Sequence, residues 1–236
     1  MKITIIETGK PPTPLNEAWA SYPVMFEALI GAADPDFTYE TVPLLDQRTL
    51  PAPDSLDAIL ITGSPAGVYD PEPWMAPLMA FIRSAAAARI PQFGICFGHQ
   101  AIAEALGGKV EKSDKGWGLG RHTYTSPHRP DWLNGVPDPF SLAVSHQDQV
   151  VAIPEGASVI AASHFTPFAG LDYGDLRAAS FQGHPEFSPA YTAALHQLRR
   201  DHIGGEIVDE AVASLRDPLD APAIGAAMAR FFRHTG

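Results

Sequence analysis

The chain has 236 residues, of which 45% are hydrophobic, so its length fits one large domain, or one domain with an appendage, around a full core. Its formal net charge of -11 argues against a nucleic-acid partner or an anionic membrane surface, because such partners require basic patches. The first residues do not form a signal-peptide pattern and no apolar run approaches the roughly 20 residues of a membrane span, so we expect no membrane partner.

The first half of the chain alternates strand and helix patterns. Strands are predicted at residues 2–7, 37–42 and 57–62 and in an apolar run that ends at Ile95, and helices at 15–30, 73–88 and 100–106. Pro23 predicts a break or kink in the first helix. Strands and helices in this order indicate an α/β fold of three layers, a flavodoxin-like, mostly parallel sheet flanked by helices.

From residue 109 to 163 the helical pattern vanishes. Short β-like pieces at 122–125, 142–145 and 159–162 predict an antiparallel extension of the sheet. A further strand is expected at 178–182, followed by helices from Ser188 to about 204, at 206–215 and at 222–232. No linker divides the chain, so we expect a single domain over residues 1–236, with a C-terminal helical extension at about 205–236.

Cys96 is the only cysteine, and it lies between Gly94 and Gly98 where the strand pattern changes to helix. This pattern is typical of a nucleophile elbow, in which the glycines relieve crowding and the helix start favours the thiolate. The alternative is a buried core cysteine, the usual fate of a lone thiol. One cysteine cannot form an internal disulfide, which favours a reducing cytoplasm as the location.

A cysteine nucleophile requires a base, and the base requires an orienting group. His184 is the best placed of the nine histidines, because it ends a predicted strand and Glu186 follows on the same side of an extended chain. The alternative for this pair is a surface turn with solvated side chains. His99 also follows the cysteine, but there its side chain would point away from the sulfur, so we expect a structural role.

The two motifs together resemble those of class I (triad, G-type) glutamine amidotransferases: Gly94-Ile95-Cys96-Phe97-Gly98-His99-Gln100 and Gly183-His184-Pro185-Glu186-Phe187. The resemblance covers most of the chain and implies a catalytic triad of Cys96, His184 and Glu186. It also places an oxyanion loop at Thr62–Val68, where the backbone N–H groups of Gly63 or Ser64, with that of Phe97, would bind the oxyanion. On composition alone the loop is an ordinary turn.

Residues 144–150 resemble the Ser-His-Gly-Asp-x-Val segment in the amidotransferase domain of GMP synthetases. The resemblance implies that Ser145, His146 and Gln147 bind the amino-acid end of the substrate, with Gln147 in place of the glycine. Gln100 matches a family side chain that contacts glutamine; a solvated helix residue is the alternative.

The resemblance implies hydrolysis of a γ-glutamyl amide through a thioester on Cys96, with no cofactor and no metal. No nucleotide-binding loop is found, so the ammonia would pass to a separate synthase subunit, or the chain would act alone as a γ-glutamyl peptide or amine hydrolase. Two other classes stay open: a metal-dependent hydrolase using His146-x-Asp148 and His184-x-Glu186, and a catalytically silent binding protein.

Overall fold

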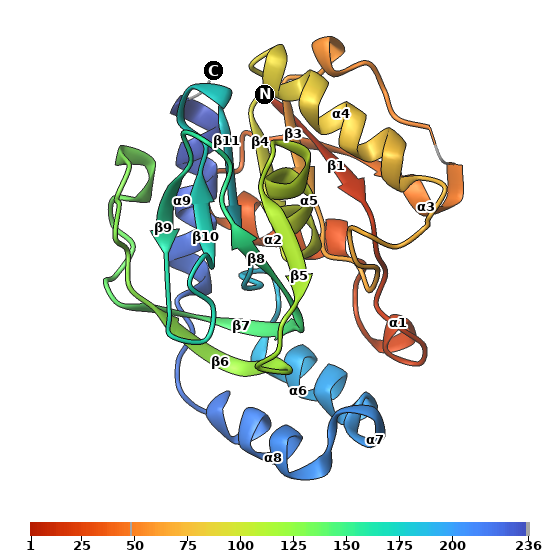
Figure 1. Ribbon diagram of the computed structural model, residues 1–236, viewed down its shortest axis with the longest axis vertical. Coiled ribbons are helices and arrows are strands. Elements are labelled where there is room, and N and C mark those ends of the chain that lie inside the picture. The colour runs from red at the N-terminus through yellow and green to blue at the C-terminus, as the bar shows by residue number, and fades with distance from the viewer. Residues whose placement is uncertain (48, 235–236) are drawn as a thin grey trace.

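The computed structural model describes residues 1–47 and 49–234, and a seven-stranded sheet runs through that part of the chain (Figure 1). Its strands are β1 (Lys2–Glu7), β2 (Thr38–Pro43), β3 (Ala58–Ile61), β4 (Gln92–Ile95), β9 (Ser158–Ala161), β10 (Gly170–Asp172) and β11 (Ala178–Phe181). In the order β2-β1-β3-β4-β11-β10-β9, the first five are parallel and the last two pair antiparallel. The predicted α/β fold class is confirmed.

Helices cover both faces of the sheet (Figure 1). On one face lie α2 (Tyr22–Ala33) and α9 (Ala221–His234), and on the other α4 (Met75–Ala87) and α5 (Phe97–Ala105). Along β3, Leu60 packs into the first apolar cluster, whereas Ile59 and Ile61 pack into the second. Because successive side chains of a strand point to opposite faces, an uninterrupted apolar run suits a strand that is buried on both sides.

The remaining strands form two separate pairs: β5 (Lys109–Lys112) with β8 (Asp148–Ala152), and β6 (Gly118–Tyr124) with β7 (Phe140–His146). The antiparallel extension of the main sheet is built by β9 and by β10, which the sequence did not predict. The expectation that the pieces at 122–125 and 142–145 also extend the main sheet is therefore wrong. β7 pairs with β6 outside the main sheet because its side chains are buried on both sides. Leu142 and Val144 pack into the main core, and Ala143 packs against α6 (Pro189–Leu198).

The helix expected at 15–30 is divided into α1 (Leu15–Ala18) and α2. The chain is extended at Ser21 (φ -65°, ψ 158°), and Pro23 lies in the first turn of α2. A proline is tolerated there, since the first N–H groups of a helix have no partner within it. Pro23 therefore marks a helix start rather than a kink. The helix expected at 100–106 begins earlier, at Phe97, directly after the cysteine.

Shorter helices complete the fold: α3 (Leu44–Gln47), α7 (Arg200–Ile203) and α8 (Gly205–Ser214). From α8, Val208 packs against Leu119 of β6, and from α9, Met228 is fully buried in the main core. The single-domain organisation with a C-terminal extension stays a prediction, and both helices of that extension pack on the rest of the chain. Among the described residues, no helix combines the length and the apolar character required to cross a membrane.

Candidate active site

Cys96 occupies a strained turn between β4 and α5. Its φ of 53° and ψ of -102° lie in a region that residues with a side chain rarely adopt. The turn is also crowded, because a Cβ on Gly94 would overlap the backbone of Gly98, and a Cβ on Gly98 would overlap the backbone of Ile61. This is the geometry of a nucleophile elbow, and it holds the sulfur at the N-terminus of α5.

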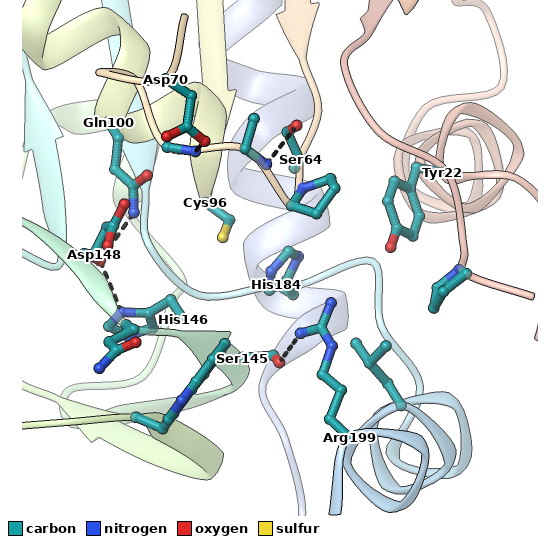
Figure 2. A pocket seen from close by; sticks show the side chains of 18 of the residues that line it. Tyr22, Ser64, Asp70, Cys96, Gln100, Ser145, His146, Asp148, His184 and Arg199 are labelled. Atoms are coloured by element: carbon teal, nitrogen blue, oxygen red, sulfur yellow. Dashed lines mark hydrogen bonds between the residues drawn. The ribbon is translucent and has the colours of Figure 1, made fainter. Parts of the chain in front are cut away.

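The parallel pairing of β3, β4 and β11 brings three loops to one edge of the sheet, where ligands of such folds bind. Gly63 follows β3, Cys96 follows β4 and His184 follows β11. A Cβ built on Gly63 would lie 3.0 Å from Cε1 of His184 and 3.7 Å from Cβ of Cys96. The three loops therefore converge, and Figure 2 shows Cys96 and His184 beside each other in one pocket.

His184 is buried and held on three sides. Its Nδ1 lies 2.7 Å from Oε1 of Glu186, its backbone N–H donates to the carbonyl of Ala143 at 2.8 Å, and its ring stacks on Phe187 with centroids 3.9 Å apart. Burial alone would lower the pKa of His184, but the negative charges of Glu186 and of the Cys96 thiolate, with hydrogen bonds to both, raise it. A protonated imidazole beside the sulfur is the form that donates a proton to a leaving amine.

The predicted oxyanion loop lies beside the sulfur. Gly63 and Ser64 line the pocket, and Phe97 is the first residue of α5. Among the hydrogen bonds of the described residues, none is donated by the backbone N–H groups of these three. The carbonyl of Gly63 accepts from the hydroxyl of Thr8 at 3.3 Å, which holds the loop in place. These N–H groups are therefore available to an oxygen bound next to the sulfur.

The pocket has a volume of about 710 Å³, and its lining includes the residues that the resemblance assigned to the substrate: Gln100, Ser145, His146 and Gln147. The backbone oxygen of Asp148 contacts both Gln100 and His146. The carbonyl of Asp148 accepts from Nε2 of Gln100 at 2.9 Å and lies 3.1 Å from Nδ1 of His146 (Figure 2). Polar side chains that are held in this way form a preorganised wall.

Sequence reasoning missed Gln182 and Arg199. Nε2 of Gln182 lies 3.5 Å from Sγ of Cys96, and its Oε1 accepts from Gln100 at 3.1 Å. The two-residue period of an extended chain would have placed Gln182 on the same side as His184. Arg199 also lines the pocket and donates to Oγ of Ser145 at 3.0 Å. No local pattern marks it, because only tertiary packing returns the end of α6 to the pocket.

Two buried histidines near the site do not contact the sulfur. Nδ1 of His99 lies 2.8 Å from Oγ of Ser180, and burial lowers the pKa of His99 to about 3. Burial, assisted by the charge of His122, also lowers the pKa of His146 to about 3. Both rings are neutral at neutral pH, which suits hydrogen-bonding roles in the core and the pocket wall. For His99 the contacts agree with the expected structural role.

The described residues contain no group of three or more His, Cys, Asp or Glu side chains placed to bind a metal ion. The carboxylate of Glu186 contacts its own neighbour His184, and His146 meets the backbone, not the side chain, of Asp148. Each of the two His-x-acid motifs is thus engaged in its own contacts.

Comparison with protein families matches residues 36–197 to glutamine amidotransferase class-I, a segment that includes Cys96, His184 and Glu186. A glutamine amidotransferase-like protein of Schizosaccharomyces pombe is 25% identical over 97% of both chains. γ-Glutamyl peptidase 3 of Arabidopsis thaliana is 33% identical over 57% of this chain and 56% of its own length. The glutamine-hydrolysing GMP synthase of Syntrophomonas wolfei is 34% identical over 55% of this chain, but the match spans only 24% of that longer protein.

Solved structures share the fold. A glutamine amidotransferase of Thermotoga maritima superposes with a TM-score of 0.79 over 98% of this chain and 97% of that one, at 16% identity. A second, from Methylobacillus flagellatus, gives a TM-score of 0.72 over 98% and 94% of the two chains, at 23% identity. The family match covers residues 36–197, which is more than half of this chain. The chain therefore belongs to the class I glutamine amidotransferase family.

Proposed function

We propose that the chain is a cysteine-dependent amidohydrolase that cleaves γ-glutamyl amides. The observation that carries the proposal is the buried His184–Glu186 pair beside a cysteine in a strained elbow. A cysteine that only filled the core would require neither a positive φ nor an oriented imidazole, and strain of this kind costs about 1–3 kcal/mol. A nucleophile, a proton carrier and an orienting carboxylate are the components of acyl transfer.

In the proposed reaction, the Cys96 thiolate attacks the γ-carbonyl carbon, and the N–H groups of Gly63, Ser64 and Phe97 stabilise the oxyanion. The C–N bond then breaks as His184 gives its proton to the leaving nitrogen. Water, deprotonated by the same imidazole, attacks the γ-glutamyl thioester and releases glutamate, which regenerates the free enzyme. Every proton and electron pair comes from the chain, the substrate or water, so we propose no cofactor.

We further propose that the wall formed by Gln100 and residues 145–147 binds the amino-acid end of the substrate. Gln100 and His146 both contact the backbone oxygen of Asp148, so their side chains are fixed before a ligand arrives. A fixed wall reduces the entropic cost of binding. Because the proposed reaction requires a reduced Cys96, a reducing cytoplasm is the compartment we propose.

Two reactions are compatible with this chemistry. In one, glutamine is the substrate and the ammonia passes to a separate synthase subunit. In the other, the chain acts alone as a γ-glutamyl peptide or amine hydrolase. The second candidate is favoured by the pocket, whose volume of about 710 Å³ and lining extend to Arg199, and γ-glutamyl peptidases are among the relatives.

The test is glutamate release by the purified chain from glutamine and a panel of γ-glutamyl amines and dipeptides, with Cys96→Ala as the control. We expect turnover by the wild type alone, and a strong increase with glutamine on adding a lysate of the source cell would favour a synthase partner. Wild-type rates equal to those of Cys96→Ala on every substrate, with no labelling of Cys96 by a glutamine-like diazoketone, would overturn the proposal.

A further inference from the structure

Arg199 places a positive charge in the pocket of Cys96, and it has no ionic partner among the residues that the structure describes. Arg199 is half-buried, and its guanidinium donates to Oγ of Ser145 at 3.0 Å and lies 6.0 Å from the ring centroid of Trp117. None of the ion pairs among the described residues includes Arg199. By contrast, its neighbour Arg200 is bound to Asp209 by two hydrogen bonds. In a chain with a net charge of -11, a pocket arginine without a carboxylate is a feature that requires explanation.

The route of the chain fixes this position. The loop that carries His184 leads directly to Ser188, whose Oγ accepts from the N–H of Tyr191 and caps α6. The helix ends at Leu198, and Arg199 follows as its C-terminal cap, beside Ser145 at the end of β7. The same segment that supplies the catalytic imidazole thus also returns a guanidinium to the pocket.

Arg199 contacts the proposed amino-acid site only at its edge, through Ser145, and lies across the sulfur from Gln100. Figure 2 shows Gln100 and Asp148 on one side of Cys96, and Arg199 and Tyr22 on the other. Burial and the neighbouring Tyr191 raise the pKa of Tyr22, and the positive charge of Arg199 acts against that rise. If the glutamyl group occupies the Gln100 side, the leaving group lies on the Arg199 side.

We propose that Arg199 binds a carboxylate of the leaving group, which makes γ-glutamyl amino acids or peptides the substrate class. The inference rests on the proposed function and makes it more specific. Guanidinium N–H groups match a carboxylate in a two-pronged hydrogen bond. In a γ-glutamyl amino acid, one carbon joins that carboxylate to the scissile nitrogen, so a cation beside the reacting centre reaches it. The same charge repels an amine leaving group that carries a second ammonium.

The test compares two substrates that differ only in that charge, γ-glutamylglycine and γ-glutamylglycinamide. The measured quantity is the ratio of their kcat/KM values in the wild type, Arg199→Gln and Arg199→Lys. We expect the wild type to prefer the acid, Arg199→Gln to lower the ratio at least about tenfold, as expected on losing a charged hydrogen bond, and Arg199→Lys to give an intermediate ratio. Arg83→Gln, on the exposed face of α4, is the matched control for net charge and should keep the wild-type ratio.

The outcomes separate the two proposals. An unchanged ratio in a folded Arg199→Gln protein would overturn the role of Arg199, and so would equal losses on both substrates, because these would place Arg199 on the shared glutamyl half. In either case the wild type would still hydrolyse γ-glutamyl compounds, so the proposed function would stand. A wild type that hydrolyses neither compound nor glutamine would overturn both.

Discussion

The carboxylate of Glu186 lies 2.7 Å from Nδ1 of His184, and both side chains are buried at the end of β11. Because the carboxylate binds one ring nitrogen, it fixes the orientation of the ring and leaves Nε2 for the sulfur. It also raises the pKa of His184 against the opposing effect of burial.

Cys96→Ala removes the proposed nucleophile. Turnover of γ-glutamyl substrates should fall by at least about 10⁴-fold, as nucleophile deletions do elsewhere. The fold should persist, because alanine loses only a sulfur in a turn whose shape is set by Gly94 and Gly98. Glutamate release and the melting temperature check the two statements. A variant with near-normal turnover would contradict the assignment of Cys96.

Glu186→Gln keeps an acceptor for the His184 ring but removes the negative charge. The rate should fall less than in Cys96→Ala, since an orienting group costs less than the nucleophile. Without the carboxylate the pKa of His184 falls, so the protonated imidazole is lost at lower pH. The alkaline limb of kcat/KM against pH should therefore move to lower pH, by about one unit or more.

The matching control is Glu155→Gln, in an exposed loop, which should keep the wild-type profile. A Glu186→Gln enzyme with a lower rate but an unmoved alkaline limb would show that the carboxylate does not set the protonation of His184.

The parallel sheet could be predicted from the sequence mainly because a central strand such as β3 is a continuous apolar run. Ala58–Ile61 are apolar and buried throughout, and Ile59 and Leu60 pack into opposite clusters. The pairing of β7 with β6 could not be predicted from the sequence. Phe140–His146 looks like any short strand, and only its burial between the main core and α6 decides that it lies outside the main sheet.

Some residues of the candidate site could likewise be predicted from the sequence, whereas others could not. Cys96 and His184 each lie in a motif whose local pattern fixes a turn, so sequence reasoning selected them. Arg199 follows an ordinary amphipathic helix, and its approach to Ser145 joins residues 54 positions apart. Contacts of that kind depend on how α6 packs, and no local spacing records them. Gln182 is an intermediate case. The alternation of an extended chain places it on the same side as His184, but sequence reasoning missed it.

The glycines of the elbow lead to a prediction about stability. Gly98→Ala places a Cβ against the backbone of Ile61, which cannot rotate away as a side chain would. We expect a loss of about 1–3 kcal/mol or more in the free energy of unfolding, the usual cost of overpacking. Urea denaturation of the variant, with its glutaminase activity, measures the effect.

Gly31→Ala is the control for that experiment. Gly31 lies within α2, and the nearest atom to an added Cβ is Oη of Tyr39 at 3.7 Å, an ordinary contact. Alanine there should stabilise the protein by about 0.5–1 kcal/mol, because it favours the helix. Equal effects of the two substitutions would show that the close approach at Gly98 does not constrain the elbow.

The buried His99 predicts sensitivity to acid. Burial lowers the pKa of His99 from 6.5 to about 3, so between these values the unfolded chain binds a proton that the folded chain does not. The stability contributed by the neutral ring is therefore present above pH 6.5 and is lost as the pH falls towards 3. From pH 7.5 to 5.5, this one group should cost about 1.4 kcal/mol.

His99→Asn isolates that contribution, because asparagine retains a polar atom for the hydroxyl of Ser180 but does not titrate in this range. The free energy of unfolding in urea, measured at pH 7.5 and 5.5, should decrease less in the variant than in the wild type, by about 1.4 kcal/mol. His164→Asn, at an exposed position, controls for the loss of a histidine. If His99→Asn and the wild type lost equal stability on acidification, His99 would have to be protonated in the folded state, and its neutral role in the core would be wrong.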